Sequence, residues 1–394
     1  MITSFKTEGL GFGFDFDIAL EPEQQIYCFI GKNGVGKTQL LENMAKSLIF
    51  QHAMFRRQSV EFKYSGLFIK QRIYDRFESK NLRLPHSVEL NGIRCKDKIR
   101  DTWGVTDFKS ILETCDQRAN FICDQPIVFI GAKNRGFTKN VDTNNIKILP
   151  SKLNLFIESF ERTWCYLNGE GLEQQEIADW FTSRLIINPN FVIQNQNREH
   201  EAVTVLEMID RLDPSLNLVT DNQNGGKTLK LIFHEGQLLI NDIPLDKLST
   251  GYVSIIKIFQ EIVAGYSGWT DEPKLNEVEG IVFIDELEPH LHISWQTKII
   301  NLLRQFFPKT TFFISTHSPL VLAGLKNGEG YELVRDGEFV KTKTIENIVL
   351  NDIVTRFFGV DLNKQRIENT DKAQSQKIKD SLLNLAKALQ EEEQ

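Results

Sequence analysis

The segment GKNGVGKT at residues 31–38 has the residue types and spacing of a loop that binds phosphate groups. Its glycines let the backbone wrap closely around an anion and point N–H groups at phosphate oxygens. The lysine would reach the outer phosphates of a nucleoside triphosphate, and the threonine hydroxyl after it would bind Mg²⁺. The candidate nucleotide-binding residues are Gly31, Asn33, Gly34, Gly36, Lys37 and Thr38. Of these, Lys37 is also a candidate catalytic residue.

Two adjacent acidic residues follow the apolar run IVFI at residues 281–284. A continuous apolar run is typical of a strand covered on both faces, and open α/β sheets hold their ligands at the carboxyl ends of such strands. Asp285 would there hold Mg²⁺ together with Thr38. Glu286 would polarise the water that attacks the outermost phosphate. The pair predicts phosphoryl transfer to water, because that chemistry requires little beyond positioning and charge neutralisation.

Two further segments supply groups that can contact a phosphate. His317 follows the apolar segment TTFFIST, and it could donate a hydrogen bond to the outermost phosphate or to the attacking water. LSTG at residues 248–251 opens a helical pattern with a hydroxyl and a glycine, Ser249 and Gly251. The start of a helix binds anions through its N–H groups, although serine is common at helix starts for structural reasons. The sequence thus has four separate segments whose chemistry suits one nucleotide.

The apolar pattern predicts the elements that must position these segments. IYCFI at residues 26–30 predicts a buried strand directly before the glycine loop, and helically spaced apolar residues predict a helix directly after it. Further buried strands are predicted ahead of Asp285 and ahead of His317. A single amphipathic helix is predicted between them, over residues 293–307. The alternation predicts an α/β fold.

In this order the four segments resemble those of ATP-binding-cassette (ABC) ATPases, and the SMC/RecF/OLD-like (AAA_21-like) branch more than the transporters. LSTGYVSIIKIFQEI stands where that family has its signature helix, IDELEPHLHISWQ resembles its acidic stretch, and STHSPLVL resembles its switch-histidine segment. The resemblance covers residues 1 to about 50 and 215 to about 360. It implies a P-loop NTPase fold of the ABC-ATPase head type, with a mixed central sheet flanked by helices. A largely helical insertion would separate the phosphate loop from the signature.

The same resemblance implies a head-to-tail homodimer that closes two ATP sites. ATP and Mg²⁺ bound at Lys37 and Thr38 of one subunit would be completed by Ser249 and Gly251 of the other. Residues 288–292 would lie along the seam of this dimer.

The sequence departs from the family pattern at one position and is ambiguous at others. Transporters follow the signature glycine with glutamine or glutamate, whereas this chain has Tyr252, which puts transport partners in doubt. The glutamine that contacts Mg²⁺ in the family has two candidates, Gln71 and the segment that contains Arg135. A second glycine–lysine segment, NGGK at 224–227, is better explained as a hairpin turn. The two histidines within 290–292 suit a metal ion poorly, because only neighbouring carboxylates would support it.

The resemblance and the apolar pattern together predict four parts of the chain. Residues 1–70 would form the N-terminal lobe of the ATPase with the phosphate loop. Residues 71–214 would form the insertion, with a return to the core sheet near 126–132. Residues 215–362 would form the C-terminal lobe, and residues 363–394 a helical tail.

Composition and charge limit the binding partners and the cellular compartment that can be expected. The formal net charge of −7 argues against a protein that is basic overall, although it does not exclude a local basic groove for DNA. The N-terminus lacks the apolar run of a signal peptide, and no stretch approaches the roughly 18 apolar residues of a membrane span. We therefore expect a cytoplasmic protein with no membrane partner.

Three functions are compatible with such an ATPase. The first is a dimeric, nucleotide-gated switch in a bacterial anti-phage defence system, similar to the ATPase subunits of OLD-type, Septu-type or PARIS-type systems. Its effector, a nuclease or a toxin, would be a separate chain, because the stretch after His317 is too short for a fused nuclease. The second is a DNA-repair or chromosome-maintenance ATPase of the RecF/SMC kind, with DNA as its partner. The third is a scaffold or sensor that binds ATP with little turnover. The resemblance favours the first.

Overall fold

The computed structural model describes most of the elements that the sequence predicts around the candidate site. The described residues are 2–8, 15–50, 52, 81–83, 87–90, 93–96, 105–107, 123–133, 135–136, 138, 149, 151–167, 176–185, 198–221, 227–234, 237–269, 274–334 and 339–341. Gln71 and the predicted tail at 363–394 lie outside them. All described elements belong to the unit formed by residues 1–345.

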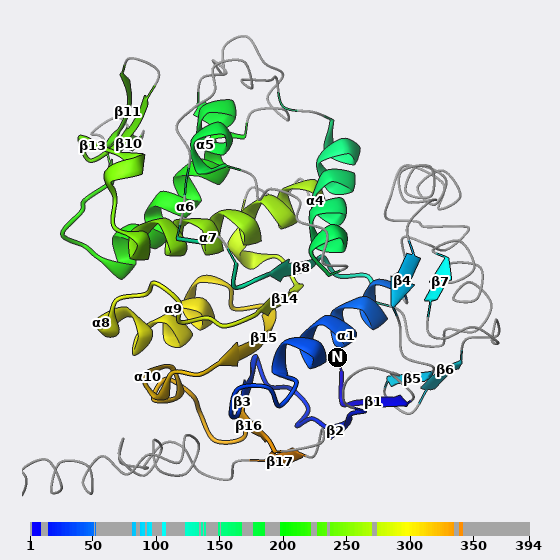
Figure 1. Ribbon diagram of the computed structural model, residues 1–394. Coiled ribbons are helices and arrows are strands. Elements are labelled where there is room, and N and C mark those ends of the chain that lie inside the picture. The colour runs from blue at the N-terminus through cyan, green and yellow to red at the C-terminus, as the bar shows by residue number, and fades with distance from the viewer. Residues whose placement is uncertain are drawn as a thin grey trace, which may run out of the picture. The chain divides into compact units, whose positions relative to one another are not determined.

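A central sheet of six strands carries the candidate site (Figure 1). In spatial order its strands are β17 (Phe339–Lys341), β16 (Gly330–Leu333), β3 (Ile26–Ile30), β15 (Thr310–Thr316), β14 (Gly280–Ile284) and β8 (Ile127–Ile130). The five strands from β16 to β8 are parallel, and β17 pairs antiparallel with β16. The predicted α/β fold with a mixed central sheet is therefore confirmed.

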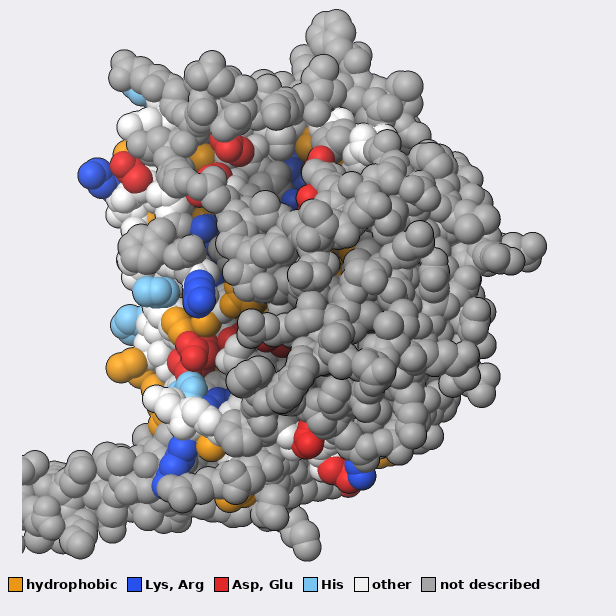
Figure 2. All heavy atoms as spheres, turned by 45° about the vertical axis from the view of Figure 1, so that its right-hand side comes forward, with side chains coloured by type: hydrophobic (Ala, Val, Ile, Leu, Met, Phe, Trp, Pro, Cys, Tyr) orange, Lys and Arg blue, Asp and Glu red, His pale blue; other side chains and the backbone are white. Residues whose placement is uncertain are grey.

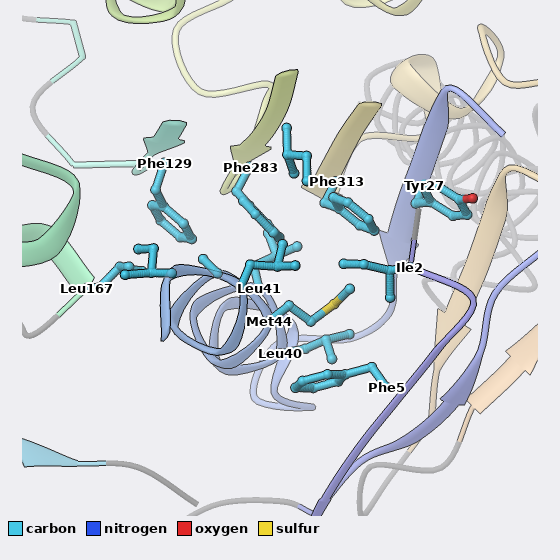
Figure 3. Packing of buried hydrophobic residues seen from close by; sticks show 14 of the residues in the cluster. Ile2, Phe5, Tyr27, Leu40, Leu41, Met44, Phe129, Leu167, Phe283 and Phe313 are labelled. Atoms are coloured by element: carbon cyan, nitrogen blue, oxygen red, sulfur yellow. The ribbon is translucent and has the colours of Figure 1, made fainter. Parts of the chain in front are cut away.

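A row of aromatic rings crosses four neighbouring strands on one face of this sheet (Figure 3). Tyr27, Phe313, Phe283 and Phe129 are direct partners in the strand register. Their ring centroids are 5.0, 5.0 and 6.0 Å apart along the row. Helix α1 (Lys37–Phe50) packs on this face through Leu40, Leu41 and Met44. Because burial of each large apolar side chain contributes about 1.5–3 kcal/mol, this packing fixes α1, and with it the loop ahead of α1, against the carboxyl ends of the strands.

The opposite face of the sheet is covered by helices α7 (Thr250–Trp269) and α9 (Ile299–Phe306). The ring of Phe307, directly after α9, lies 6.2 Å from the ring of Phe312 in β15. A methyl group of Val128 in β8 lies so close to α7 that a Cβ added at Gly265 would meet it at 2.3 Å. Coverage on both faces explains why the parallel strands are continuous apolar runs.

The prediction of a single helix over residues 293–307 is wrong, because the structure has two helices here. Helix α8 (Ile293–Gln296) ends before α9 begins. Thr297 and Lys298 form a turn between the two helices, and the hydroxyl of Thr297 donates a hydrogen bond to the carbonyl oxygen of Ser294 at 2.9 Å. The apolar periodicity runs through this break, so the pattern alone could not reveal it.

Smaller sheets surround the central one. An antiparallel sheet in the order β2–β1–β5–β6 packs Ile2 and Phe5 against α1 (Figure 3). Its strands are β1 (Ser4–Glu8), β2 (Asp17–Ala19), β5 (Ser87–Leu90) and β6 (Ile93–Lys96). Antiparallel pairing also joins β4 (Asn81–Arg83) to β7 (Val105–Asp107), β9 (Val219–Asp221) to β10 (Lys227–Leu229), and β11 (Leu231–His234) through β12 (Gln237–Ile240) to β13 (Ile243–Pro244).

Three helices between β8 and β9 form the described helical part of the predicted insertion. They are α4 (Lys152–Leu167), α5 (Ile177–Leu185) and α6 (Glu199–Leu212), and α4 and α6 both pack on α7. A fully buried carboxylate, Glu201, joins these elements, since it accepts hydrogen bonds from Arg184 in α5 and from Ser267 in α7. Among the described helices, none combines the length and the apolar composition that a membrane span requires.

Candidate functional site

The phosphate loop of residues 31–36 joins β3 to α1 in a conformation that depends on glycine. The φ angles of Gly34 and Gly36 are +82° and +97°, which residues with a side chain rarely adopt. Gly31 has a φ of +154°, and a Cβ added there would lie 2.6 Å from the carbonyl oxygen of Leu333 in β16. Asn33 is exposed in the turn of the loop. The loop therefore curves around the start of α1, where N–H groups are available to bind an anion.

The Lys37 ammonium lies over this loop. Its Nζ donates hydrogen bonds to the carbonyl oxygens of Gly31 at 2.9 Å and Lys32 at 3.0 Å. The residue is only 5% exposed, and this burial lowers the pKa of Lys37 to about 8, whereas the carboxylates after β14 raise it. The ammonium is thus partly desolvated and held by neutral carbonyl groups.

Thr38 and Asp285 face each other across the end of the sheet. The Thr38 hydroxyl lies 3.0 and 2.9 Å from the two carboxylate oxygens of Asp285. The hydroxyl of Ser315 donates to the same carboxylate at 2.6 Å. A carboxylate and a hydroxyl are oxygen ligands of the kind that Mg²⁺ prefers, so the donor set fits the predicted ion. Thr38 and Asp285 are the residues that would hold it.

Glu286 follows Asp285 with its backbone in the left-handed region, at a φ of +48°. Its N–H donates a hydrogen bond to the Ser315 hydroxyl at 2.7 Å. Its carbonyl oxygen accepts a hydrogen bond from the guanidinium of Arg135, which lies in the segment after β8. A guanidinium has no acceptor atom, so Arg135 cannot take the place of a glutamine that contacts Mg²⁺.

His317 is placed by Glu288. The Glu288 carboxylate accepts hydrogen bonds from the His317 N–H at 2.7 Å and from the Thr316 hydroxyl at 2.6 Å. The imidazole Nδ1 lies 3.5 Å from Nζ of Lys37. Because an ammonium only donates, Nδ1 faces it as an acceptor, and the ring hydrogen then lies on Nε2. Burial, and next the charge of Lys37, lower the pKa of His317, so the ring is neutral at pH 7.

Ser249 and Gly251 make their contacts elsewhere in the chain. The exposed Ser249 accepts a hydrogen bond from the Tyr252 N–H at 3.4 Å. A Cβ added at Gly251 would lie 2.7 Å from the carbonyl oxygen of His290. The Tyr252 ring packs edge-to-face on Trp295, with centroids 4.6 Å apart. In the described part of the chain, these contacts at the start of α7 are with the 290–295 segment and do not involve the phosphate loop.

Comparison with known proteins gives a family match and several relatives. Residues 173–322 match the family model described as "AAA ATPase domain", a stretch that includes the acidic pair and His317 but begins after the phosphate loop. The chain is 24% identical to the Septu protein PtuA of Bacillus thuringiensis over 332 residues, 81% of this chain and 72% of that protein. It is 39% identical to the Septu protein PtuA of Bacillus mycoides over 95 residues, 24% of this chain and 13% of the relative.

A third relative is the Retron Vc95 probable ATPase of Vibrio cholerae, 56% identical over 43 residues, which are 11% of this chain and 8% of that protein. The predicted resemblance to ATPases is confirmed. The chain spans a small part of two of these three relatives, 13% and 8% of their lengths.

Two residues that contact the candidate site, Ser315 and Glu288, were not predicted to be site residues. Ser315 contacts both acidic residues, and Glu288, which was predicted only as part of a dimer seam, also holds His317. A signal for Ser315 existed, because it is a small polar residue at the end of the buried strand TTFFIST. The structure describes part of the two other ambiguous segments. The His292 side chain caps α8 by accepting from the Ser294 N–H. Of NGGK, only Lys227 is among the described residues, and it begins β10, which pairs with β9.

Proposed function

We propose that this chain binds ATP together with Mg²⁺ and hydrolyses the ATP to ADP and phosphate. The observation that supports this proposal is the convergence of three distant segments at one edge of the sheet. Thr38 in the phosphate loop segment contacts Asp285 after β14, and Lys37 lies beside His317 after β15. This combination of groups is the one that phosphoryl transfer requires.

Each residue has a distinct role in this proposal. Lys37 exchanges its carbonyl partners for phosphate oxygens, which are stronger acceptors because they are charged. Thr38 and Asp285 hold Mg²⁺, which supplies positive charge that neutralises the phosphates. Glu286 orients the attacking water and accepts its proton, and His317 donates a hydrogen bond from Nε2 to the outermost phosphate.

The proposed active form is a head-to-tail homodimer. Gly251 packs on His290 of its own chain and Ser249 contacts the N–H of Tyr252, so a second copy would have to bring these residues to the nucleotide. Ser249 is exposed and therefore available for such a contact. Hydrolysis would separate the two copies, and the nucleotide would act as a switch.

The proposed setting is a bacterial anti-phage defence system with a separate effector chain, a nuclease or a toxin. Similarity to Septu protein PtuA over 81% of this chain supports this setting. The proposal places the protein in the cytoplasm, where ATP is available. DNA is a further candidate partner, although on the face shown in Figure 2 the described Lys and Arg side chains are separated and interspersed with Asp, Glu and His.

The decisive measurement is ATP binding and hydrolysis by the wild type and by two variants. Lys37→Ala should abolish ATP binding, since it removes the ammonium from the phosphate loop. Glu286→Gln should keep ATP binding and lower kcat by about a hundredfold or more. It should also trap an ATP-bound dimer, visible by light scattering coupled to size-exclusion chromatography.

Lys227→Ala is a matched control, because Lys227 ends the second glycine–lysine segment. Its ion pair with Glu207 is exposed on both sides, so its loss should leave both stability and ATP binding nearly unchanged. Equal ATP binding by Lys37→Ala and Lys227→Ala would sink the assignment of the site. Wild-type ATP binding with no turnover, and no effect of Glu286→Gln, would indicate a scaffold.

The defence setting is tested in cells. The chain, expressed with its neighbouring genes, should reduce phage plating, and Lys37→Ala should abolish that protection. Unchanged plating with an active ATPase would reject the defence setting alone. Strong stimulation of ATP hydrolysis by DNA, falling steeply with salt, would favour a repair ATPase instead.

A further inference from the structure

Arg135 links the segment after β8 to the acidic turn after β14. Its side chain is fully buried, and its Nη2 donates a hydrogen bond to the carbonyl oxygen of Glu286. The next residue, Gly136, packs directly on the same turn, because a Cβ added there would lie 2.8 Å from the imidazole of His290. Two segments far apart in sequence are therefore held together at the residue that the proposed mechanism needs most.

Both backbone groups of Glu286 are held by side chains, one from β15 and one from the segment after β8. The N–H donates to the Ser315 hydroxyl, and the carbonyl oxygen accepts from Arg135. Glu286 also has a φ of +48°, a conformation that costs on the order of 1–3 kcal/mol for a residue with a side chain. Such strain persists only where the surroundings enforce it. The two hydrogen bonds hold the backbone of Glu286 in this conformation. They therefore set the direction in which its side chain leaves the backbone.

The surroundings of the Arg135 guanidinium are also unusual. Among the described residues, its Nε and Nη1 are buried and have no hydrogen-bond partner. Burial lowers the pKa of Arg135 to about 10, while Glu288 and Asp285 raise it, so the group remains charged at neutral pH. A buried cation is costly unless negative charges lie near it. The acidic turn after β14 supplies them, which favours a functional placement over a packing role.

We propose that Arg135 is a positioning residue of the ATPase: it holds the peptide group of Glu286 so that the carboxylate points at the water that attacks the outermost phosphate. This inference rests on the proposed function and deepens it. Arg135 acts through Glu286 and does not itself contact the nucleotide. Its loss should therefore affect the chemical step and leave ATP binding intact.

The test is a double-mutant cycle between Arg135→Met and Glu286→Gln, measured as single-turnover hydrolysis rates. Arg135→Met alone should lower kcat by about thirtyfold or more, with the affinity for a non-hydrolysable ATP analogue within about threefold of the wild type. In the Glu286→Gln background the same change should cost almost nothing further. A purely structural role would lower ATP affinity and kcat together, and a role independent of Glu286 would give additive losses; either result overturns the inference.

Arg135→Lys is the second variant, in case Arg135→Met does not fold. It keeps the buried positive charge but replaces the planar fork with a single flexible donor. We expect a loss of kcat smaller than that of Arg135→Met, again with unchanged nucleotide affinity. Wild-type kcat in Arg135→Lys would overturn the proposal. No ATP turnover by the wild type would overturn the proposed function and this inference with it, whereas turnover with additive losses would overturn this inference alone.

Discussion

Acid should destabilise the fold through His52, which lies just after α1 at the edge of the central sheet. The side chain is 3% exposed, and its Nε2 lies 3.0 Å from the carbonyl oxygen of Gln125. The imidazole packs edge-to-face on Trp269, with centroids 4.8 Å apart. Burial lowers the pKa of His52 to about 4, and the hydrogen bond to Gln125 opposes this only in part.

The sign of the effect follows from the two protonation states. In the unfolded chain a histidine titrates near its ordinary pKa of about 6.5. Between about pH 6.5 and pH 4 the unfolded state binds a proton that the folded state does not, so stability falls as the pH falls through this window. The difference of about 2.5 pK units corresponds to a total of about 3 kcal/mol, of which about 2 kcal/mol is lost by pH 5.

The assay is urea denaturation of the wild type and of His52→Gln between pH 7.5 and pH 5. Glutamine can donate to the Gln125 carbonyl oxygen but does not titrate, so the other acid-sensitive groups cancel in the comparison. The free energy of unfolding of the wild type should fall by about 2 kcal/mol more than that of the variant. The reasoning would be refuted if the free energies of unfolding of the two proteins fell in parallel with pH. A pKa near 6.5 for His52 in the folded protein, measured by NMR, would refute it as well.

Two further changes test the packing that supports the site. Glu201→Gln should cost about 3–5 kcal/mol of stability in chemical denaturation, because it leaves the buried guanidiniums of Arg184 and Arg198 without their carboxylate; a loss under about 1 kcal/mol would contradict this. Gly268→Ala should cost about 1–3 kcal/mol, since the new Cβ would lie 2.6 Å from the backbone nitrogen of Phe156 in α4. If Gly268→Ala unfolded at the melting temperature of the wild type, α4 and α7 would be able to separate without cost, contrary to this prediction.

The phosphate loop was predictable because all of its determinants are local. A buried strand, a glycine-rich turn and an apolar-periodic helix follow one another within residues 26–50, and each has its own signature in the sequence. The apolar runs ahead of Asp285 and His317 predicted strands for the same reason, and the structure has them as β14 and β15. The break between α8 and α9 escaped prediction, because the apolar pattern continues through Thr297 and Lys298 without a change.

The contacts around the acidic pair depend on strand register instead. Ile284 in β14 is the direct partner of Ile314 in β15, so the residues that follow them, Asp285 and Ser315, meet at the end of the sheet. A shift of one residue would turn Ser315 to the other face. Arg135 comes from a third segment, and its place at Glu286 follows from the pairing of β8 with β14.

The sequence by itself therefore determined which chemical groups are present and which short elements carry them, because glycine conformations, apolar periodicity and acidic strand ends act over a few residues. Only the tertiary structure decided which groups share a hydrogen bond. Sheet pairing brought together residues more than 100 positions apart, and through Ser315, Glu288 and Arg135 it fixed the direction of the side chains that the chemistry uses.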